Sequence, residues 1–411
     1  MGTKLLILSI LLQISYVFTI IENCPNEERG SLAFIIEDAS SMAVDIQQVK
    51  AGIDGVFDAV LKSKSSPIEN FILVSFDDSD ARTAILTRDR VEFKQALSNI
   101  HADGVAGSKY SLSGIEHALE KSLPFSYLYV FTDAPAKDSL KYELIKRLAQ
   151  MKSSQISFIL TGKHNYEQDP DYSVYYTLAR ATSGLVMHVD KPDVSEIMSF
   201  IGEKAEYCSS VIYNGALQPG YGQEVKFNIE EHQTDVKISA FGNRPKLEAV
   251  NNNQNVKQET EVRIDTELMI VVNLLTNEPG EYTAVMGSES ATKVNIDAVK
   301  PIGFVHGFSS IKPSSVEDTA TLPKSGVKSY LAVKLHQYSA NVKLSKIKLL
   351  DLDGNVTLEY PVEVTDEKGG LYVTDLIDVP KDMFRIMVVG YDVNSNAIIS
   401  KMGRTPIEAT Q

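Results

Sequence analysis

Residues 31–42 read SLAFIIEDASSM, and this stretch decides the fold of the first half of the chain. Its apolar run, 31–36, is typical of a strand that is buried on both faces of a parallel sheet. Glu37, Asp38 and a pair of serines follow where the run stops. Polar side chains at such a strand end either bind a ligand or are simply solvated, and the rest of the chain bears on that choice.

Strand-like and helix-like segments alternate after this stretch. We expect strands at 71–76, 84–86, 127–133, 156–162 and 184–190. We expect helices from residue 44 onward and at 91–100, 112–123, 139–151, 172–182 and 194–205. This alternation predicts an α/β doubly wound fold around a central, mostly parallel sheet. In such sheets ligands bind at the carboxyl ends of the strands, which is where Glu37, Asp38 and Asp133 fall.

The character of the sequence changes after Cys208. Helical periodicity fades, and strand-like runs are separated by turns rich in Asn, Gly and Pro. Asp353-Gly354 is a hairpin signal between two such runs. We therefore expect a first domain over 24–208 and two all-β sandwich-like modules after it. The predicted modules cover 209–300 and 301–411, and the second is immunoglobulin/fibronectin-like.

The amino terminus predicts export from the cell. Lys4 precedes an apolar run over 5–18, which suits a secretory signal and is short for a membrane span. We expect a signal peptide over residues 1–20 and a secreted, extracellular protein with no membrane insertion. The alternative for this run is a buried strand or helix of the folded domain.

Cys24 and Cys208 are the only cysteines in the sequence. In a secreted protein, a single pair most simply forms one disulfide. Such a bond would hold the two ends of the first domain beside each other. Two unpaired thiols are the alternative.

Composition argues against several classes of function. The formal net charge is −14 and no basic cluster occurs, which disfavours nucleic acid and anionic membranes as partners. The histidines show no HExxH or other close zinc spacing, and there is no GxSxG or P-loop motif. We expect a protein that is not an enzyme, and a hydrolase at the acidic strand ends is the weakest hypothesis.

One glycosylation sequon lies in the second β module. It is Asn355-Val356-Thr357, directly after the predicted hairpin glycine. In a secreted protein an asparagine at a hairpin turn is accessible, so the sequence predicts a glycoprotein. The alternative is an ordinary turn.

The turn at 37–42, at the end of the first strand of a doubly wound domain, resembles that of the von Willebrand factor type A (VWA) domain. Within that group the chain is similar to the N-terminal region of the hemicentins. The segments that carry this likeness are 37–42, 71–78, 113–138, 156–162 and 184–191, with a thinner likeness at 278–285, 303–309 and 384–392. A disulfide between the two ends of the domain is also seen in members of the group. The resemblance implies cell adhesion or an extracellular matrix role, with an extracellular or matrix protein as partner.

The resemblance also implies a metal-ion-dependent adhesion site. VWA domains often hold Mg²⁺ or Ca²⁺ with Asp-x-Ser/Thr-x-Ser from one loop, Thr or Asp from a second and Asp from a third. Carried onto this chain, the ligands fall on Glu37, Ser41 and Asp133. The middle hydroxyl position falls on Ala39, and the second-loop position falls near Ala106. The alternates that a one-residue shift or a neighbouring position would offer are Asp38, Ser40 and Ser108.

The match to the metal site is imperfect, so the sequence predicts a degenerate site. Glu37 extends the carboxylate by one methylene, and Ala39 offers no oxygen. Mg²⁺ demands near-octahedral geometry and tolerates both changes poorly, whereas Ca²⁺ is less strict. Two interpretations stay open: an adhesion protein whose bound metal is completed by an acidic side chain of the partner, and a metal-independent structural component of a matrix or of a secreted fluid such as a venom.

Overall fold

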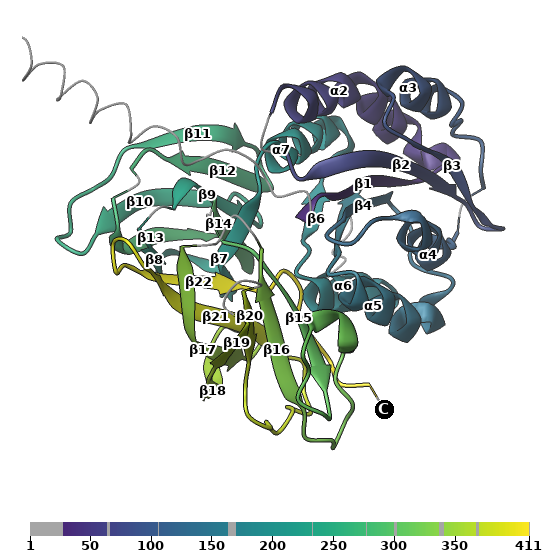
Figure 1. Ribbon diagram of the computed structural model, residues 1–411. Coiled ribbons are helices and arrows are strands. Elements are labelled where there is room, and N and C mark those ends of the chain that lie inside the picture. The colour runs from purple at the N-terminus through teal and green to yellow at the C-terminus, as the bar shows by residue number, and fades with distance from the viewer. Residues whose placement is uncertain are drawn as a thin grey trace, which may run out of the picture.

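The computed structural model describes residues 28–63, 66–105, 107–162, 170–231, 233–276, 278–299, 302–336, 341–366 and 370–410. The predicted signal peptide, Cys24 and Ala106 lie outside these residues. An α/β domain comes first and is followed by antiparallel all-β sheets (Figure 1). The predicted fold class is therefore confirmed.

Six strands form the sheet of the α/β domain, in the order β3-β2-β1-β4-β5-β6. They are β1 (Gly30–Glu37), β2 (Ile68–Phe76), β3 (Ala81–Thr87), β4 (Tyr127–Thr132), β5 (Gln155–Thr161) and β6 (Val186–Val189). Only the edge strand β3 runs antiparallel to its neighbour. Strand β1 lies in the middle and all its residues are buried, which confirms the prediction of a strand covered on both faces.

Helices cover both faces of this sheet (Figure 1). One layer contains α2 (Ala43–Lys62), α3 (Arg90–Ser98) and α7 (Val194–Glu206), and the other contains α4 (Ser111–Lys121), α5 (Tyr142–Met151) and α6 (Ser173–Thr182). Side chains of β1 alternate between the layers, because successive residues of a strand point to opposite faces. Phe34 and Ile36 belong to the first apolar core, whereas Ala33 and Ile35 belong to the second. The helices expected in this half of the chain are all present.

The first β module is a sandwich of two antiparallel sheets, ordered β10-β13-β8 and β11-β12-β9-β14-β7. Its strands are β7 (Ser209–Leu217), β8 (Gly220–Ile229), β9 (Thr234–Phe241), β10 (Lys246–Asn252), β11 (Thr260–Asp265), β12 (Met269–Leu274), β13 (Gly280–Ser288) and β14 (Thr292–Val299). One apolar core fills the space between the sheets. In it the rings of Phe227 and Tyr282 stack with their centroids 5.7 Å apart.

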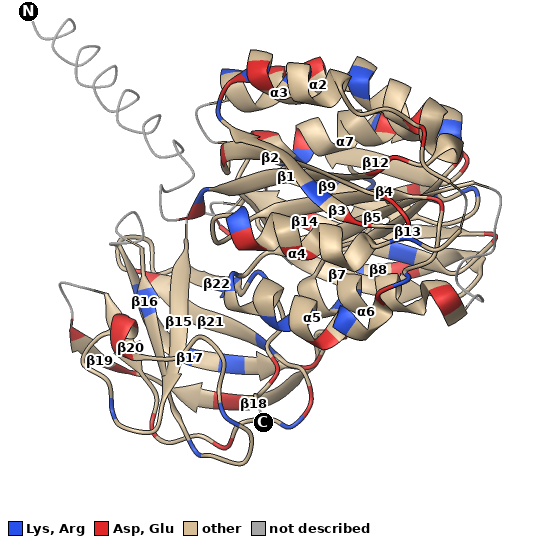
Figure 2. Ribbon diagram, turned by 90° about the vertical axis from the view of Figure 1, so that its right-hand side faces the viewer, with Lys and Arg blue, Asp and Glu red and all other residues tan. Residues whose placement is uncertain are grey.

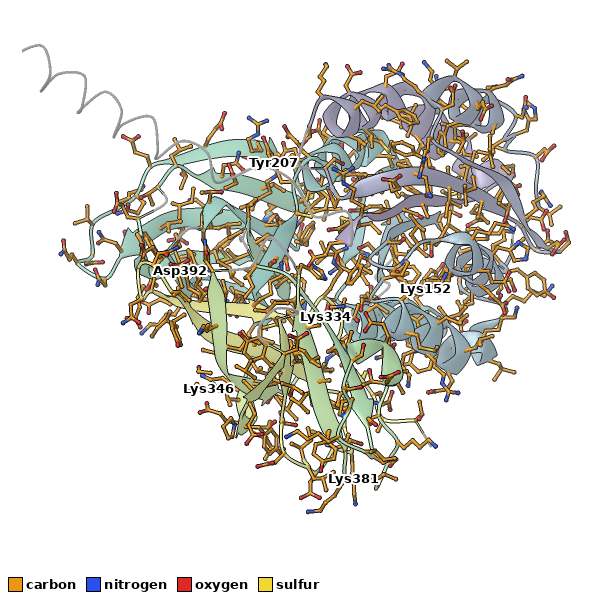
Figure 3. All side chains as sticks on the ribbon, in the orientation of Figure 1. Lys152, Tyr207, Lys334, Lys346, Lys381 and Asp392 are labelled. Atoms are coloured by element: carbon orange, nitrogen blue, oxygen red, sulfur yellow. The ribbon has the colours of Figure 1, made fainter. Side chains whose placement is uncertain are left out.

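The second β module is also a sandwich, with sheets β15-β16-β20-β19 and β18-β17-β21-β22. Its strands are β15 (Phe304–Ser309), β16 (Tyr330–Leu335), β17 (Val342–Leu350), β18 (Val356–Pro361), β19 (Glu363–Asp366), β20 (Leu371–Val373), β21 (Arg385–Asp392) and β22 (Ile398–Met402). The predicted hairpin joins β17 to β18, and Gly354 adopts the positive φ of +90° that this turn requires. On the outside of this module, Lys346 of β17 bonds Glu359 of β18 at 2.8 Å (Figure 3).

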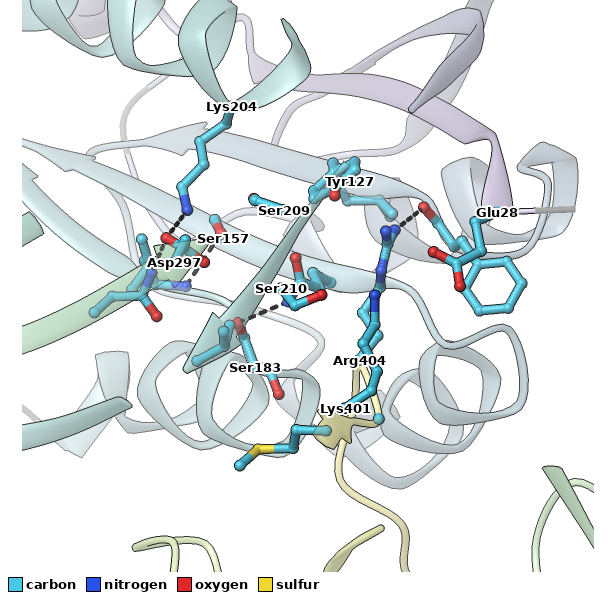
Figure 4. Close-up of a pocket in the computed structure, with 18 of the residues that line it drawn as sticks. Glu28, Tyr127, Ser157, Ser183, Lys204, Ser209, Ser210, Asp297, Lys401 and Arg404 are labelled. Carbon is cyan, nitrogen blue, oxygen red and sulfur yellow. Dashed lines mark hydrogen bonds and ion pairs between the residues drawn. The ribbon is translucent and has the colours of Figure 1, made fainter. Parts of the chain in front are cut away.

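The amino ends of the central strands face the two β modules. A cavity of about 70 Å³ lies at this junction, lined by Glu28, Tyr127 and Gln155 from the α/β domain and by Asp297 and Lys401 from the modules (Figure 4). The carboxyl ends of the strands therefore lie at the opposite end of the sheet, away from the modules. The predicted domain boundaries stay predictions, because Cys24 and residues 300–301 are not described.

Acidic and basic residues are interspersed over the α/β domain (Figure 2). On the outer helices, for example, Arg90 bonds Asp54 and Asp58, and Lys94 bonds Asp54. Exposed pairs of this kind add little stability. Within the described ranges, none of the helices combines the length and the apolar character that crossing a bilayer demands.

Candidate functional site at the carboxyl-end rim

Loops from four places in the sequence meet at the carboxyl ends of the central strands. We call this surface the rim, and it consists of 38–45, 103–105, 107–110, 133–141 and Lys191. Short parallel bridges join Ala39 to Gly104 and Lys109 to Ala136. The rim forms because β1 and β4 are neighbours, so the turns that follow them emerge side by side.

Two of the predicted ligands, Ser41 and Asp133, are in direct contact. The Ser41 hydroxyl donates a hydrogen bond of 3.0 Å to Oδ1 of Asp133. These residues are far apart in the sequence, so the strand-end argument brought the right loops together. Whether either residue binds a metal stays a prediction.

Glu37 is wholly buried and turned inward, with 0% of its surface exposed. Its Oε2 accepts hydrogen bonds from the Thr132 hydroxyl at 2.5 Å and from the backbone N–H of Asp133 at 3.3 Å. Burial raises the pKa of this carboxyl to about 7, although the Thr132 hydrogen bond works against that rise. The ammonium of Lys109, itself wholly buried, lies 3.9 Å from Oε1.

The alternate set of ligands faces elsewhere. Oδ2 of Asp38 accepts a hydrogen bond of 2.8 Å from Arg82 on the edge strand β3. Ser40 and Ser108 have exposed side chains. Over the described part of the chain, no hydrogen bond links Asp38, Ser40 or Ser108 to Asp133, so the structure does not bring the alternates to one point with the third loop.

The ammonium group of Lys191 occupies the centre of the rim. Its Nζ lies 2.9 Å from Oδ2 of Asp45, 2.9 Å from Oδ2 of Asp133 and 3.0 Å from the carbonyl oxygen of Ser41. An ammonium has three N–H donors, and these three acceptors use all of them. Burial alone would lower the pKa of Lys191, but the hydrogen bonds with Asp133 and Asp45 outweigh it and raise the pKa. The group is therefore charged at neutral pH.

Sequence reasoning missed the cations of the rim and one of its acids. Lys191 lies two residues after the end of β6, Lys109 precedes α4, and Asp45 sits in the first turn of α2 with its side chain wholly buried. The rule that selected Glu37 and Asp133, a polar residue at a strand end, would also have selected Lys191. A metal site predicts oxygen ligands alone, and so the sequence pattern does not point to an ammonium.

The residues present do not fit a divalent ion at this position. Mg²⁺ and Ca²⁺ bind oxygen ligands, yet the oxygens of Ser41, Asp45 and Asp133 surround an ammonium instead. Ala39 contributes no oxygen, and Glu37 is engaged by Thr132 below the surface. Across the described ranges, no three His, Cys, Asp or Glu residues gather as a metal cluster would require.

The two predicted modification sites stay predictions. Asn355 is exposed at the tip of the hairpin, and its Nδ2 donates a hydrogen bond of 2.9 Å to Asp351. Cys208 lies between α7 and β7, whereas Cys24 is not among the described residues. The disulfide between Cys24 and Cys208 therefore stays a prediction.

The junction cavity is a second place where a ligand could bind. The contacts around it join the α/β domain to the β modules. At about 70 Å³ it has room for a few waters and is far smaller than ordinary small-molecule pockets. Lys204 of α7 forms an ion pair with Asp297 of β14 across its wall. The guanidinium of Arg404 lies 4.8 Å above the ring of Tyr127 (Figure 4).

Residues 31–191 match the family model of the von Willebrand factor A domain, and the α/β part of this chain has a VWA-like fold. The chain is also similar to mouse hemicentin-1, with 27% identity over 373 residues, and to mouse hemicentin-2, with 29% identity over 383 residues. These matches cover 89% and 91% of this chain but only 7% and 8% of the hemicentins. The predicted resemblance is therefore confirmed, while the chain spans a small fraction of its relatives' length.

Two further likenesses each cover less than half of this chain. Mouse von Willebrand factor A domain-containing protein 7 is 28% identical over 186 residues, which cover 42% of this chain and 20% of that protein. Proximal thread matrix protein 1 from the mussel byssus was solved with zinc in its metal-ion-dependent adhesion site (MIDAS) motif. It is 15% identical to this chain, with a TM-score of 0.34. That match covers 47% of this chain and 52% of the mussel protein.

Proposed function

We propose that this chain is a secreted, non-catalytic protein that binds an extracellular or matrix protein through the rim of its VWA domain. Similarity to the hemicentins over most of the chain supports a role in extracellular protein interactions. The observation that carries the proposal is a set of exposed apolar side chains around the rim.

Three segments of the rim, among them the first turn of α2, each present one such side chain. Val44 is 45% exposed, Val105 is 60% exposed and Leu140 is 98% exposed. Single exposed apolar residues are common, but a group of them around a polar centre is typical of protein–protein interfaces. Short backbone bridges, between Ala39 and Gly104 and between Lys109 and Ala136, join the parts of the rim that carry these side chains.

The charged groups of the rim support a binding role over a catalytic one. Each of the three acids at the ends of β1 and β4 has a cation of the chain beside it: Asp38 has Arg82, Asp133 has Lys191, and Glu37 has Lys109. A general base or nucleophile has to be aimed at a substrate. Here the carboxylates hold neighbouring loops together instead.

The proposal is tested by solid-phase binding of the purified chain to a reconstituted basement-membrane protein extract. Leu140→Asp and Val105→Asp should each weaken binding by about tenfold or more, because a charge replaces an apolar contact. The matched control is Ile311→Asp, since Ile311 is 77% exposed on a loop of the second β module. Equal loss in the control, or full binding by both rim variants, contradicts the proposal.

A structural role, in a matrix or a secreted fluid, is the second candidate. The Lys191 contacts favour it because they remove the need for metal, and the β modules would then present the docking surface. In the same assay this alternative predicts that Ile311→Asp weakens binding while the rim variants do not.

A further inference from the structure

The rim has the oxygen atoms of a cation site, and the cation that fills it belongs to the chain itself. We infer that the ammonium of Lys191 takes the place of the divalent ion in this VWA domain, so that the rim is formed without metal and excludes Mg²⁺, Ca²⁺ and Mn²⁺. Lys191 thus becomes the organising residue of the surface, a role that neither the VWA model match nor the similarity to hemicentins assigns to it.

Oxygen atoms of the chain surround the ammonium group of Lys191. Its Nζ has Asp45, Asp133 and the Ser41 carbonyl within 3.0 Å, and the Thr161 hydroxyl follows at 3.4 Å. Two carboxylates and two neutral oxygens form a ligand set that suits a positive charge. With all three donors used, the ammonium gains nothing by moving out into solvent.

Lysine ammonium groups also contact each of the loops that a bound metal would connect. Lys109 donates a hydrogen bond to the carbonyl oxygen of Val105 and approaches Glu37. Lys191 ties the first loop, through Ser41, to the third loop, through Asp133. Each of the three loops that supply metal ligands in this kind of site is therefore held by an internal lysine.

Hydrogen bonds fix the position of Lys191 and of the helix that follows it. It opens the turn Lys191–Asp193 between β6 and α7, and the backbone N–H of Asp193 closes that turn onto Asp190 at 2.8 Å. The far end of α7 is held as well, because the Ser66 hydroxyl donates to the carbonyl oxygen of Ala205 at 2.7 Å. A divalent ion could enter only by displacing the ammonium, since two cations in one small site repel each other strongly.

This inference sharpens the proposed function, and its consequence for the partner rests on that function. A bound metal would leave an open position for an acidic side chain of the partner, whereas Lys191 leaves none. Recognition would instead use Val44, Val105 and Leu140, with the exposed hydroxyls of Ser40 and Ser41 between them. Binding should then persist in chelator.

The test is binding of Mn²⁺ itself, followed by calorimetry and by the electron paramagnetic resonance signal of the free ion. We expect no saturable binding by the wild-type chain. Lys191→Ala removes the ammonium and leaves its oxygen acceptors, so Mn²⁺ affinity should rise by about tenfold or more, and Lys191→Ala/Asp133→Asn should lose that gain. Lys191→Met keeps the side-chain volume and serves if the alanine variant does not fold.

Lys137→Ala is the matched control for this experiment. Lys137 lies on the same rim and bonds the carbonyl oxygen of Asp78 at 2.9 Å, so its loss changes the net charge equally without opening the site. Saturable Mn²⁺ binding by the wild-type chain that Asp133→Asn abolishes would overturn the inference. So would a folded Lys191→Ala variant that binds no more Mn²⁺ than Lys137→Ala. Neither outcome depends on a partner, so failure here is separate from failure of the proposed function.

Discussion

The two ends of the central sheet use lysine–carboxylate pairs for different purposes. At the rim, the side chain of Lys191 is 26% exposed and its partners Asp45 and Asp133 belong to the same domain. At the junction, Lys204 bonds Asp297 across a domain boundary and both side chains are largely covered. The same chemistry therefore preforms an exposed surface at one end and fixes two domains together at the other.

Helix α7 connects these two ends. It begins three residues after Lys191 and carries Lys204 in its last turn. Glu203 beside it accepts hydrogen bonds from Lys237 at 2.7 Å and Arg263 at 3.2 Å, both on the first β module. This helix thus anchors the β module at one terminus and supports the cation of the rim at the other.

Removal of the junction ion pair should have the largest effect on stability. Lys204→Ala removes the ammonium that pairs with the buried Asp297 and leaves it the Asn295 amide as a donor, so we expect a loss of about 3–5 kcal/mol in the free energy of unfolding. Urea denaturation followed by circular dichroism measures it. Lys237→Ala, at the edge of the same interface, should cost clearly less. Equal costs for both variants would mean that burial does not distinguish Lys204 from its neighbours.

Acid should weaken the junction through Glu28. Burial alone would raise the pKa of this carboxyl, but Lys401, His336 and Arg404 outweigh burial and lower the pKa from 4.5 to about 2. The charged form therefore contributes about 3 kcal/mol above pH 4.5, and this contribution is lost as the pH falls toward 2. Glu28→Gln should flatten the acid limb of stability against pH, whereas Glu143→Gln, on the exposed surface, should leave it unchanged. An equally steep limb in Glu28→Gln contradicts this account of the junction.

Removal of the cation at the rim should have an intermediate effect. Lys191→Ala removes the ammonium that bonds the wholly buried Asp45 and leaves it Thr161 as a side-chain donor, so we expect a cost of about 1–3 kcal/mol in metal-free buffer. Added Mn²⁺ should restore part of this loss, as thermal unfolding would show. Lys137→Ala should stay within about 0.5 kcal/mol of wild type under both conditions. If Mn²⁺ stabilised Lys191→Ala no more than Lys137→Ala, this would contradict the claim that Lys191 fills a cation site.

The smallest expected effect on stability is at the exposed edge of the rim. Leu140→Asp should change the free energy of unfolding by less than about 0.5 kcal/mol, because Leu140 makes few contacts within the chain. Its effect should appear in partner binding alone. A large loss of stability in this variant would show that Leu140 belongs to the core and not to a docking surface.

The sequence predicted the α/β domain better than the β modules for a physical reason. Strands buried on both faces, such as 71–76, are continuous apolar runs that stand out from their surroundings. Sandwich strands with one solvated face do not, because polar and apolar side chains alternate along them. In β8 the burial alternates only toward the carboxyl end, so the pattern of Gly220–Ile229 is weak.

The candidate site was predicted in its location but not in its chemistry. Strand order and strand ends suffice to place Ser41 beside Asp133, because both follow adjacent parallel strands. The sequence does not say which side chain reaches into the space between them. Lys191 comes from a loop two strands away, and only the fold shows that its ammonium lies between the carboxylates.

The central claim is that Lys191 is the resident cation of the rim, and NMR of its side-chain ammonium tests that claim most directly. We expect a slowly exchanging ¹⁵N-labelled ammonium signal that disappears in Lys191→Ala, because three hydrogen bonds shield the group from water. That signal should be unchanged by millimolar Mg²⁺ and by EDTA. A signal that is lost on addition of Mg²⁺ and returns with EDTA would show that a metal displaces Lys191, and would contradict the account.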